Sequence, residues 1–197
     1  IWLTRVVGSS HSLGNGQTLE LGEATISGSL SVQGGSLSAE QLTLSAPLQL
    51  SAGSLAVHQQ MQIAPQGLLH VEGISTTNFT GGLMNDGELA MQSALATVEG
   101  GTLDNRGVVR GNGRINMPLN NLSNGRVQVG ANERLQFLAT ENTNSGTIEV
   151  GTSGAIEFLN ELQNTVSGRI IARDSSLQFG GGLQNDGELL LSGGAID

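Results

Sequence analysis

The amino-acid sequence predicts an all-β fold in which short parallel strands stack as successive coils of a β-solenoid. Three observations predict this fold: a glycine-containing turn that recurs about every twenty residues, apolar pairs that recur in phase with it, and a scarcity of large aromatic residues. The 197 residues include 30 Gly but only four Phe, one Trp and no Tyr. Because compact globular cores rely on large aromatic side chains to fill them, this composition favours a thin core that is uniform along the chain.

The recurring turn is clearest in two nearly identical segments, Gly-Gly-Leu-Met-Asn-Asp-Gly-Glu-Leu at 81–89 and Gly-Gly-Leu-Gln-Asn-Asp-Gly-Glu-Leu at 181–189. A weaker Asn-x-Gly pattern lies between them, and its glycines follow at steps of 20, 18, 21, 22 and 19 residues: Gly87, Gly107, Gly125, Gly146, Gly168 and Gly187. Such a period is typical of solenoids, in which each coil stacks on an equivalent coil. A β-sandwich also has short strands, but it has no reason to repeat one turn at a constant interval.

Three sets of apolar positions predict three short strands in each coil, which gives a roughly triangular cross-section. The first set comprises Leu30, Leu48, Leu69, Leu89, Val109, Val127, Ile148, Ile170 and Leu189. The second set comprises the pairs Leu55/Val57, Ile115/Met117, Leu135/Phe137, Ile156/Phe158 and Leu177/Phe179. The third set is less regular and comprises Leu42/Leu44, Met61/Ile63, Leu103, Leu122, Leu162 and Leu183.

Stacking also predicts roles for individual residues. Phe137, Phe158 and Phe179 are one coil apart, so we expect them to form an aromatic stack inside the rod. We expect asparagines to line one corner, where the side-chain amide can bond the neighbouring coil: Asn105, Asn124, Asn144 and Asn185. The glycines that follow them are expected to adopt backbone angles that other residues resist.

The period extends into the first eighty residues, where the Asn-x-Gly pattern is absent. We therefore expect one solenoid over residues 1–197, with irregular coils over 1–80 and Asn-x-Gly coils over 81–197. The last residues, Leu-Ser-Gly-Gly-Ala-Ile-Asp (191–197), parallel Val-Gly-Thr-Ser-Gly-Ala-Ile-Glu (150–157), so the sequence stops within a repeat. This pattern favours a segment of a longer polypeptide, with identical chains stacked end to end as the alternative.

Charge and composition exclude several classes of function. The net charge is −9, Lys is absent and all eight basic residues are Arg, so no basic stripe is available to bind nucleic acid. No apolar run reaches the roughly 18 residues of a membrane-spanning helix. The absence of Cys excludes a disulfide scaffold and thiolate metal sites.

Histidines and carboxylates are the remaining candidates for catalysis or metal binding. His11, His58 and His70 fall on different predicted faces, so their spacing does not predict a metal site. Glycoside hydrolysis needs two acids about 5–10 Å apart, which in a solenoid means carboxylates on adjacent coils. Glu149 and Glu157 point outward without such a partner, since their expected neighbours are Gln128 and Ile171, and Gln136 and Gln178.

The other polar positions also have structural explanations. Asp86 and Asp186 belong to the Asn-Asp-Gly turns, whose residue types suit tight turns, so calcium binding is not predicted. Arg110 and Arg126 have no acidic cluster beside them. The outward residues of the first set are mixed: Gln49, His70, Ala90, Arg110, Gln128, Glu149, Ile171 and Leu190. Those of the second set form an amide-rich stripe, interpreted as stabilising neighbouring coils rather than binding glycans: Asn116, Gln136, Glu157 and Gln178. We therefore expect no catalytic, cofactor-binding or metal-binding residue, and no enzymatic activity.

The segment Asn-Ser-Gly-Thr-Ile-Glu-Val-Gly-Thr-Ser-Gly-Ala-Ile-Glu-Phe (144–158) resembles the repeats of β-helical passengers in filamentous-haemagglutinin-like exoproteins and autotransporters of Gram-negative bacteria. The resemblance covers residues 81–197 and reaches the first eighty residues only through spacing. It implies a right-handed parallel β-helix that is secreted or displayed on the cell surface and has structural or adhesive duties. The partners it implies are further coils of the same polypeptide or identical neighbouring subunits, together with host or matrix glycans or proteins.

The sequence therefore predicts the non-enzymatic stalk of a large secreted or surface-displayed adhesin. The alternative is a subunit of an extracellular filament or sheath that stacks end to end. A carbohydrate-active β-helix enzyme is the least favoured of the three.

Overall fold

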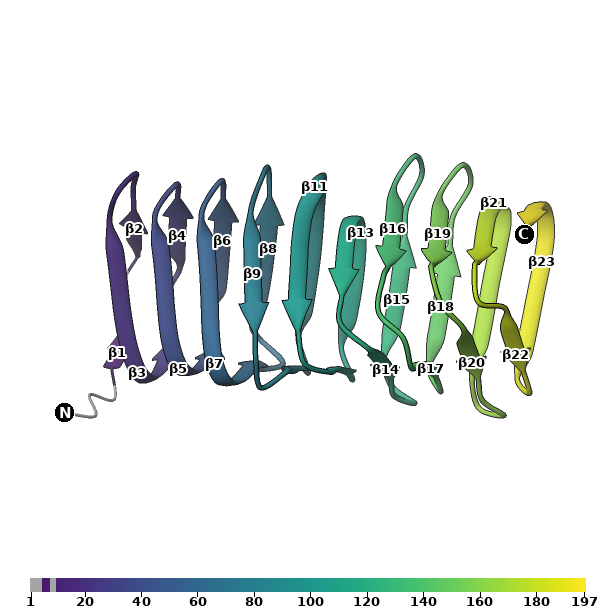
Figure 1. Cartoon of the computed structure of the whole chain (residues 1–197), viewed down its shortest axis with the longest axis horizontal. Helices are drawn as coiled ribbons and strands as arrows, with labels where there is room; N and C mark the ends of the chain where they lie inside the picture. Colours follow the sequence, from purple (N-terminus) through teal and green to yellow (C-terminus); the bar gives the residue numbers. More distant parts are fainter. Residues whose placement is uncertain (1–4, 8–9) are drawn as a thin grey trace.

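The computed structural model describes residues 5–7 and 10–197, and these residues form an all-β rod. Their regular elements are 23 strands and no helix. All of the strand pairings in this part of the chain are parallel. The coils follow one another along the rod from the amino-terminal to the carboxyl-terminal end (Figure 1). The β-solenoid predicted from the sequence is confirmed.

Each coil has three sides, here called faces A, B and C in the order in which the chain visits them. Face A consists of β2 (His11–Leu13), β4 (Leu30–Gln33), β6 (Pro47–Ser51), β8 (Leu68–Glu72), β15 (Arg126–Val129), β18 (Thr147–Val150) and the first parts of β11 (Glu88–Gly100), β13 (Val108–Asn116), β21 (Arg169–Phe179) and β23 (Glu188–Ile196). Face B consists of β9 (Thr76–Phe79), β16 (Arg134–Phe137), β19 (Ala155–Phe158), the later parts of β11, β13, β21 and β23, and the first parts of β3 (Thr18–Ile26), β5 (Ser36–Leu44) and β7 (Ser54–Ile63).

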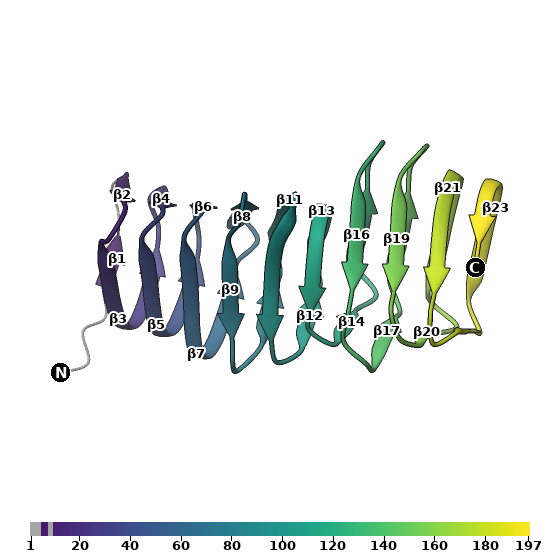
Figure 2. The same cartoon turned by 45° about the horizontal axis from the view of Figure 1, so that its top comes forward.

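Face C consists of β1 (Arg5–Val7), the later parts of β3, β5 and β7, and six three-residue strands: β10 (Leu83–Asn85), β12 (Leu103–Asn105), β14 (Leu119–Asn121), β17 (Asn142–Asn144), β20 (Leu162–Asn164) and β22 (Leu183–Asn185). Figure 2 shows the short face C strands beside the longer strands of face B. With coils about 4.8 Å apart, the described rod is about 40 Å long.

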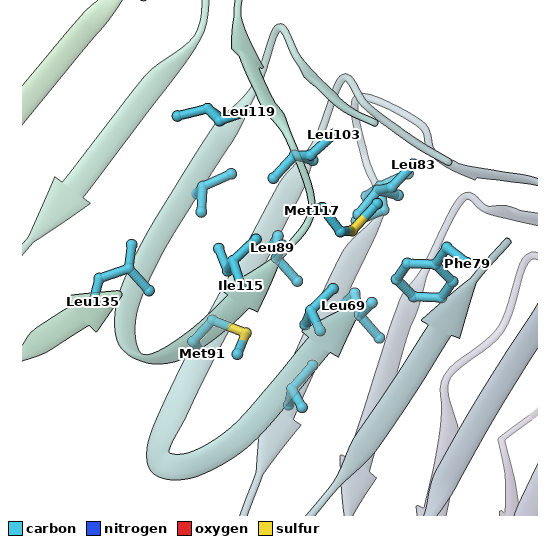
Figure 3. Close-up of a cluster of buried hydrophobic side chains, with 14 of the residues drawn as sticks. Leu69, Phe79, Leu83, Leu89, Met91, Leu103, Ile115, Met117, Leu119 and Leu135 are labelled. Carbon is cyan, nitrogen blue, oxygen red and sulfur yellow. The ribbon is translucent and has the colours of Figure 1, made fainter. Parts of the chain in front are cut away.

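The core is a set of apolar rows that run along the rod. Every member of the first predicted set pairs in register with the next member, from Leu30 opposite Leu48 to Ile170 opposite Leu189. Phe137, Phe158 and Phe179 stack as predicted, with ring centroids 4.8 and 5.9 Å apart and interplanar angles of 7° and 11°. Figure 3 shows the buried residues where the two halves of the rod meet, including Leu69 and Leu89.

Two of the predicted rows contain errors of register. In the second set, Ile115 lies opposite Phe137, and Gly113 rather than Ile115 lies opposite Leu135. The reason is the length of the corner between faces A and B. β13 continues through this corner, whereas residues 130–133 form a separate turn between β15 and β16. Figure 2 shows the corners before β16 and β19 extending further than the corner within β13.

In the third set, Leu122 is wrong, because Leu119 lies opposite Leu103 and Leu122 follows the end of β14. In the coil after β14, Asn142 of β17 occupies this row and lies opposite Leu162. Its side chain is buried and satisfied, since Oδ1 accepts a hydrogen bond from the backbone N–H of Leu119 at 3.1 Å and Nδ2 donates to the carbonyl oxygen of Ala139 at 2.8 Å.

A ladder of six asparagines runs along the inner side of face C. In each step, Nδ2 of one residue donates to Oδ1 of the next at 2.6–2.7 Å, through Asn85, Asn105, Asn121, Asn144, Asn164 and Asn185. The first five side chains are 0% exposed. The predicted amide bonding between coils is confirmed, but Asn124 was the wrong member, because in that coil two further residues separate the ladder residue Asn121 from the turn.

The repeated glycines are required by space rather than by backbone angle. None of the six has a positive φ, which corrects the expectation from the sequence. A Cβ atom on Gly125 would lie 2.3 Å from the carbonyl oxygen of Asn105 and 2.3 Å from Oδ1 of Asn121. A Cβ atom on Gly107 would lie 2.1 Å from the carbonyl oxygen of Gly87. Stacked turns leave no room for a side chain at this position.

Gly125→Ala is expected to destabilise the rod by about 1–3 kcal/mol, because the new methyl group overlaps backbone that neighbouring coils hold in place. Gly151→Ala is the matched control, since a Cβ atom there meets nothing closer than 3.4 Å and the residue has no positive φ. Urea unfolding followed by circular dichroism measures both. Equal midpoints for the two variants would contradict the steric explanation.

Asn121→Ala is expected to lower the free energy of unfolding by about 2–4 kcal/mol, because it leaves Oδ1 of Asn144 without a donor and removes the acceptor of Asn105. Asn120→Ala changes the adjacent, outward-facing residue and is expected to cost less than about 1 kcal/mol. The same unfolding measurement compares them. A loss no greater for Asn121→Ala than for Asn120→Ala would show that the ladder contributes little.

Candidate functional site

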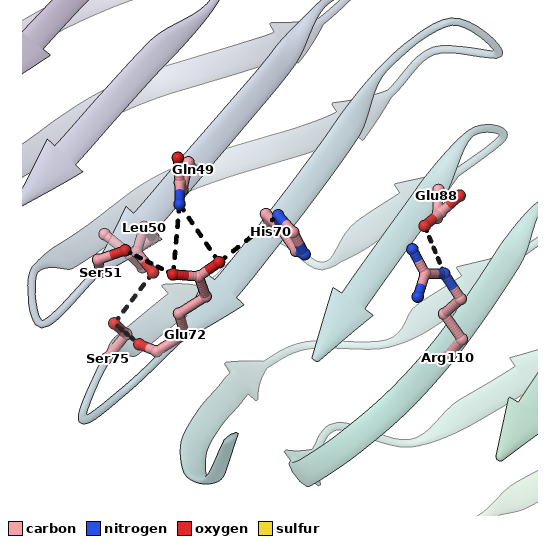
Figure 4. Close-up of polar contacts among 8 residues, drawn as sticks. All are labelled: Gln49, Leu50, Ser51, His70, Glu72, Ser75, Glu88 and Arg110. Carbon is pink, nitrogen blue, oxygen red and sulfur yellow. Dashed lines mark hydrogen bonds and ion pairs between the residues drawn. The ribbon is translucent and has the colours of Figure 1, made fainter. Parts of the chain in front are cut away.

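The outer side of face A carries charged and polar residues that pair with one another between coils. Glu72 accepts hydrogen bonds from Nε2 of Gln49 at 3.2 Å and from Oγ of Ser51 at 3.0 Å, and its carboxylate lies 3.8 Å from Nδ1 of His70 (Figure 4). Nε of Arg110 donates a hydrogen bond to Oε1 of Glu88, one coil earlier, at 2.6 Å. These contacts link adjacent coils and leave few charged groups free for a ligand.

Ion pairs continue along face A toward the carboxyl-terminal end. Arg126 lies 3.2 Å from Glu149, Arg173 lies 3.9 Å from the same carboxylate, and Arg169 pairs with Glu188. Arg110 and Arg126 are not register partners, because Arg110 lies opposite Gln128. A hollow of about 400 Å³ includes Arg110 and Glu149, both of which are already paired.

On face B, Glu157 is the centre of a polar cluster. Arg134 Nη2 donates to its carboxylate at 2.7 Å and Gln136 Nε2 donates at 2.6 Å. The hydrogen bond from Arg134 and then that from Gln136 hold the pKa of Glu157 below its usual value of 4.5, against the opposing effect of burial. The expected stripe needs one correction, because Arg114 and not Asn116 lies opposite Gln136, and Asn116 lies opposite Glu99.

The predicted surroundings of the single carboxylates are confirmed. Glu149 lies between Gln128 and Ile171, and Glu157 lies between Gln136 and Gln178. Asp86 accepts a hydrogen bond from Gln62 at 3.3 Å and lies 3.6 Å from Arg106, so it bonds across coils at its turn.

The three histidines occupy separate places in the fold. His11 is in β2 and pairs with Leu30, His70 is in β8 on the same face three coils on, and Nε2 of His58 lies 3.3 Å from Oγ of Ser38. Within residues 5–7 and 10–197, no group of three or more His, Cys, Asp or Glu side chains is placed to hold a metal ion. In the same part of the chain no helix is long and apolar enough to cross a membrane.

A polar groove of about 600 Å³ lies on face C, over β17, β20 and β22. Its lining comes from three successive coils: Thr140, Glu141, Asn142, Thr143, Asn160, Glu161, Gln163, Gly181 and Gln184. Thr143, Gln163 and Gln184 form one outward row, since Thr143 lies opposite Gln163 and Gln163 opposite Gln184. Glu141 and Glu161 directly precede the paired residues Asn142 and Leu162, so the two carboxylates belong to adjacent coils.

Four polar side chains of this face C groove are without partners. Among the described residues, Glu141, Glu161, Gln163 and Gln184 make no side-chain hydrogen bond or ion pair. No basic residue lines the groove. Glu141 has a φ of 62°, a left-handed angle that is uncommon for a residue with a side chain. The groove therefore offers uncommitted hydrogen-bonding groups on three consecutive coils.

Sequence reasoning missed this groove. The carboxylates that the sequence offers as candidates are Glu149 and Glu157, and the less regular spacing of the third set does not predict which of its neighbours meet. The twenty-residue separation of Glu141 and Glu161 and the twenty-one-residue separation of Gln163 and Gln184 were the available signals. Both separations equal one coil.

The fold and this surface define the chain as a parallel β-solenoid with a groove on face C that carries unpartnered polar side chains. Comparison of the chain with models of known protein families, with curated proteins and with solved structures finds no match in any of the three.

Glu157→Gln is expected to remove a small, pH-dependent part of the stability. A carboxylate whose pKa is lowered on folding adds stability above its unfolded pKa and loses it as the pH falls through the folded pKa. Because Arg134 is 58% exposed, we expect the loss at neutral pH to stay below about 1 kcal/mol and to vanish in strong acid.

Urea unfolding at neutral and strongly acidic pH measures the difference between Glu157→Gln and the unsubstituted chain. Glu99→Gln is the control, since no described residue forms a hydrogen bond or ion pair with the Glu99 side chain. A difference that is the same at both pH values would contradict the role assigned to the Glu157 cluster.

Proposed function

We propose that this chain is a non-enzymatic structural and adhesive β-helix, which serves as the stalk of a large secreted or surface-displayed adhesin. The observation that carries the proposal is the cross-linking of successive coils over residues 85–188. The asparagine ladder bonds six coils inside face C, and Arg–Glu pairs bond coils outside face A. A rod of this kind resists bending and separates what lies at its two ends.

The surface chemistry supports a structural rather than catalytic role. Most charged side chains of faces A and B are neutralised by a partner one coil away, as Glu157 is by Arg134 and Glu88 by Arg110. Such pairs stabilise neighbouring coils and engage the carboxylates that a carbohydrate-cleaving site on these faces would need.

An extracellular setting accords with the composition. A chain without Cys has no thiol to cross-link or oxidise during export, and its net charge of −9 keeps it apart from anionic surfaces. The repeats of residues 144–158 supply the further support, through their resemblance to β-helical passengers of Gram-negative exoproteins. The expected partners are further coils of the same polypeptide and matrix or host glycans or proteins.

A filament subunit that stacks end to end is the alternative. Leu191 and Ile196 of β23 are 47% and 41% exposed, and their strand has a free edge in the described structure. Another parallel coil placed there would bury both side chains and pair the edge. Either a continuing polypeptide or a second copy of this chain could supply that coil.

Antibodies raised against the folded chain separate these proposals in the source cells. Immunogold electron microscopy is expected to label the outside of the cell, and immunoblotting is expected to detect a polypeptide much larger than 197 residues. Extracellular filaments made of a polypeptide of about this size would favour the alternative. Labelling confined to the cell interior would overturn both.

A further inference from the structure

The groove on face C is a concave surface on which four polar lining side chains have no hydrogen-bond or ion-pair partner among the described residues. Gln163 and Gln184 each present a free amide, which both donates and accepts hydrogen bonds. Glu141 and Glu161 each present a free carboxylate, which accepts hydrogen bonds in up to four directions. On face B, by contrast, the Gln136 amide and the Glu157 carboxylate are bonded to each other.

The chemistry of the lining excludes several classes of ligand. Phosphates, sulfates and acidic polysaccharides require Arg or Lys, and the groove contains neither but has two carboxylates. Lipids and flat apolar molecules require large apolar or aromatic side chains, and none lines the groove. The groups that remain suit a ligand rich in hydroxyl groups, because each hydroxyl can donate to a carboxylate and accept from an amide.

The shape of the groove indicates how such a ligand lies. Its lining residues come from three consecutive coils, so the groove extends along the rod axis. Coils are about 4.8 Å apart, which is close to the length of one sugar ring in an extended chain. Its volume of about 600 Å³ is within the ~300–1,000 Å³ of ordinary ligand sites.

We propose that the face C groove binds a neutral oligosaccharide lying along the rod axis. The amides of Gln163 and Gln184 bond hydroxyl groups of successive sugar rings, and the carboxylates of Glu141 and Glu161 accept hydrogen bonds from hydroxyls at the groove wall. Charge-assisted bonds to these carboxylates are the strongest contacts available there. Without an aromatic platform, the affinity is expected to be modest, with a Kd of about 0.1–1 mM.

This site deepens the proposed function, on which it rests for its biological setting, by naming a ligand class for the side of the rod. Binding in vitro is measured without reference to where the protein resides in the cell. A failed titration therefore leaves the structural role untouched, and intracellular labelling leaves a measured affinity untouched.

The test is a titration of the full, isotope-labelled chain, followed by nuclear magnetic resonance. The neutral probes are cellohexaose, maltohexaose, mannohexaose and hexa-N-acetylchitohexaose, with oligogalacturonate as the acidic probe and calcium chloride as the cation probe. At least one neutral hexasaccharide is expected to shift the side-chain amide signals of Gln163 and Gln184. No such shift with any of them at ~10 mM would overturn the proposal.

Substitutions locate the binding. The double variant Gln163→Ala and Gln184→Ala is expected to weaken the affinity at least ~10-fold, and Glu161→Gln is expected to weaken it less, because the new amide can still bond a hydroxyl. Gln178→Ala removes an exposed amide from face B and is the matched control. Backbone signals show whether each variant keeps its fold.

Three other outcomes would overturn the proposal. Binding that is unchanged in the double variant would place the oligosaccharide elsewhere on the rod. A response to oligogalacturonate but to no neutral probe would contradict the argument from charge. A response to calcium alone would make Glu141 and Glu161 a cation site.

Discussion

Each residue of a coil meets its equivalent on the next coil at about 4.8 Å, and the rest of the structure depends on this constraint. Inside the rod, equivalent positions stack into rows, such as the three phenylalanines and the leucine and valine row of face A. On the surface of the rod, the same repetition would place like charges side by side unless acidic and basic residues alternate from coil to coil. Arg110 beside Glu88 and Arg126 beside Glu149 show this alternation. At one position of the recurring turn, it leaves room only for glycine.

The asparagine ladder shows how the constraint admits polar groups into a core. A buried amide is costly unless its donor and acceptor are both bonded, and an identical amide on each neighbouring coil supplies both. The row has a beginning, because Asn85 lies opposite Ile63 and its Oδ1 has no hydrogen-bond partner. Before that point the same row is apolar, with Ile26, Leu44 and Ile63. One row of one sheet thus changes from apolar packing to hydrogen bonding without a change of backbone geometry.

The constraint also separates the surface into two kinds. Many polar side chains of faces A and B bond adjacent coils, so those groups contribute to the rigidity of the rod. The face C groove is formed where three short strands and their preceding turns leave side chains that bond nothing in the described chain. One rod can therefore serve both as a stiff support and as a ligand-binding surface. The coils that hold the groove residues at a fixed spacing are the same coils that provide stiffness. A regular spacing of hydrogen-bonding groups suits a ligand that is itself a repeating chain.

The sequence by itself determined the fold class, the coil length, the face A row and the phenylalanine stack. These follow from local patterns, because period-two alternation defines which residues face inward and recurring turn residues define the period. Only the tertiary structure decided that Leu119 and Asn121 replace Leu122 and Asn124, that Ile115 lies opposite Phe137, and that Glu141 and Glu161 share a groove. The register between two coils depends on how many residues each corner uses. The number of residues in each corner is decided by contacts between coils, and the sequence pattern within one coil does not specify it.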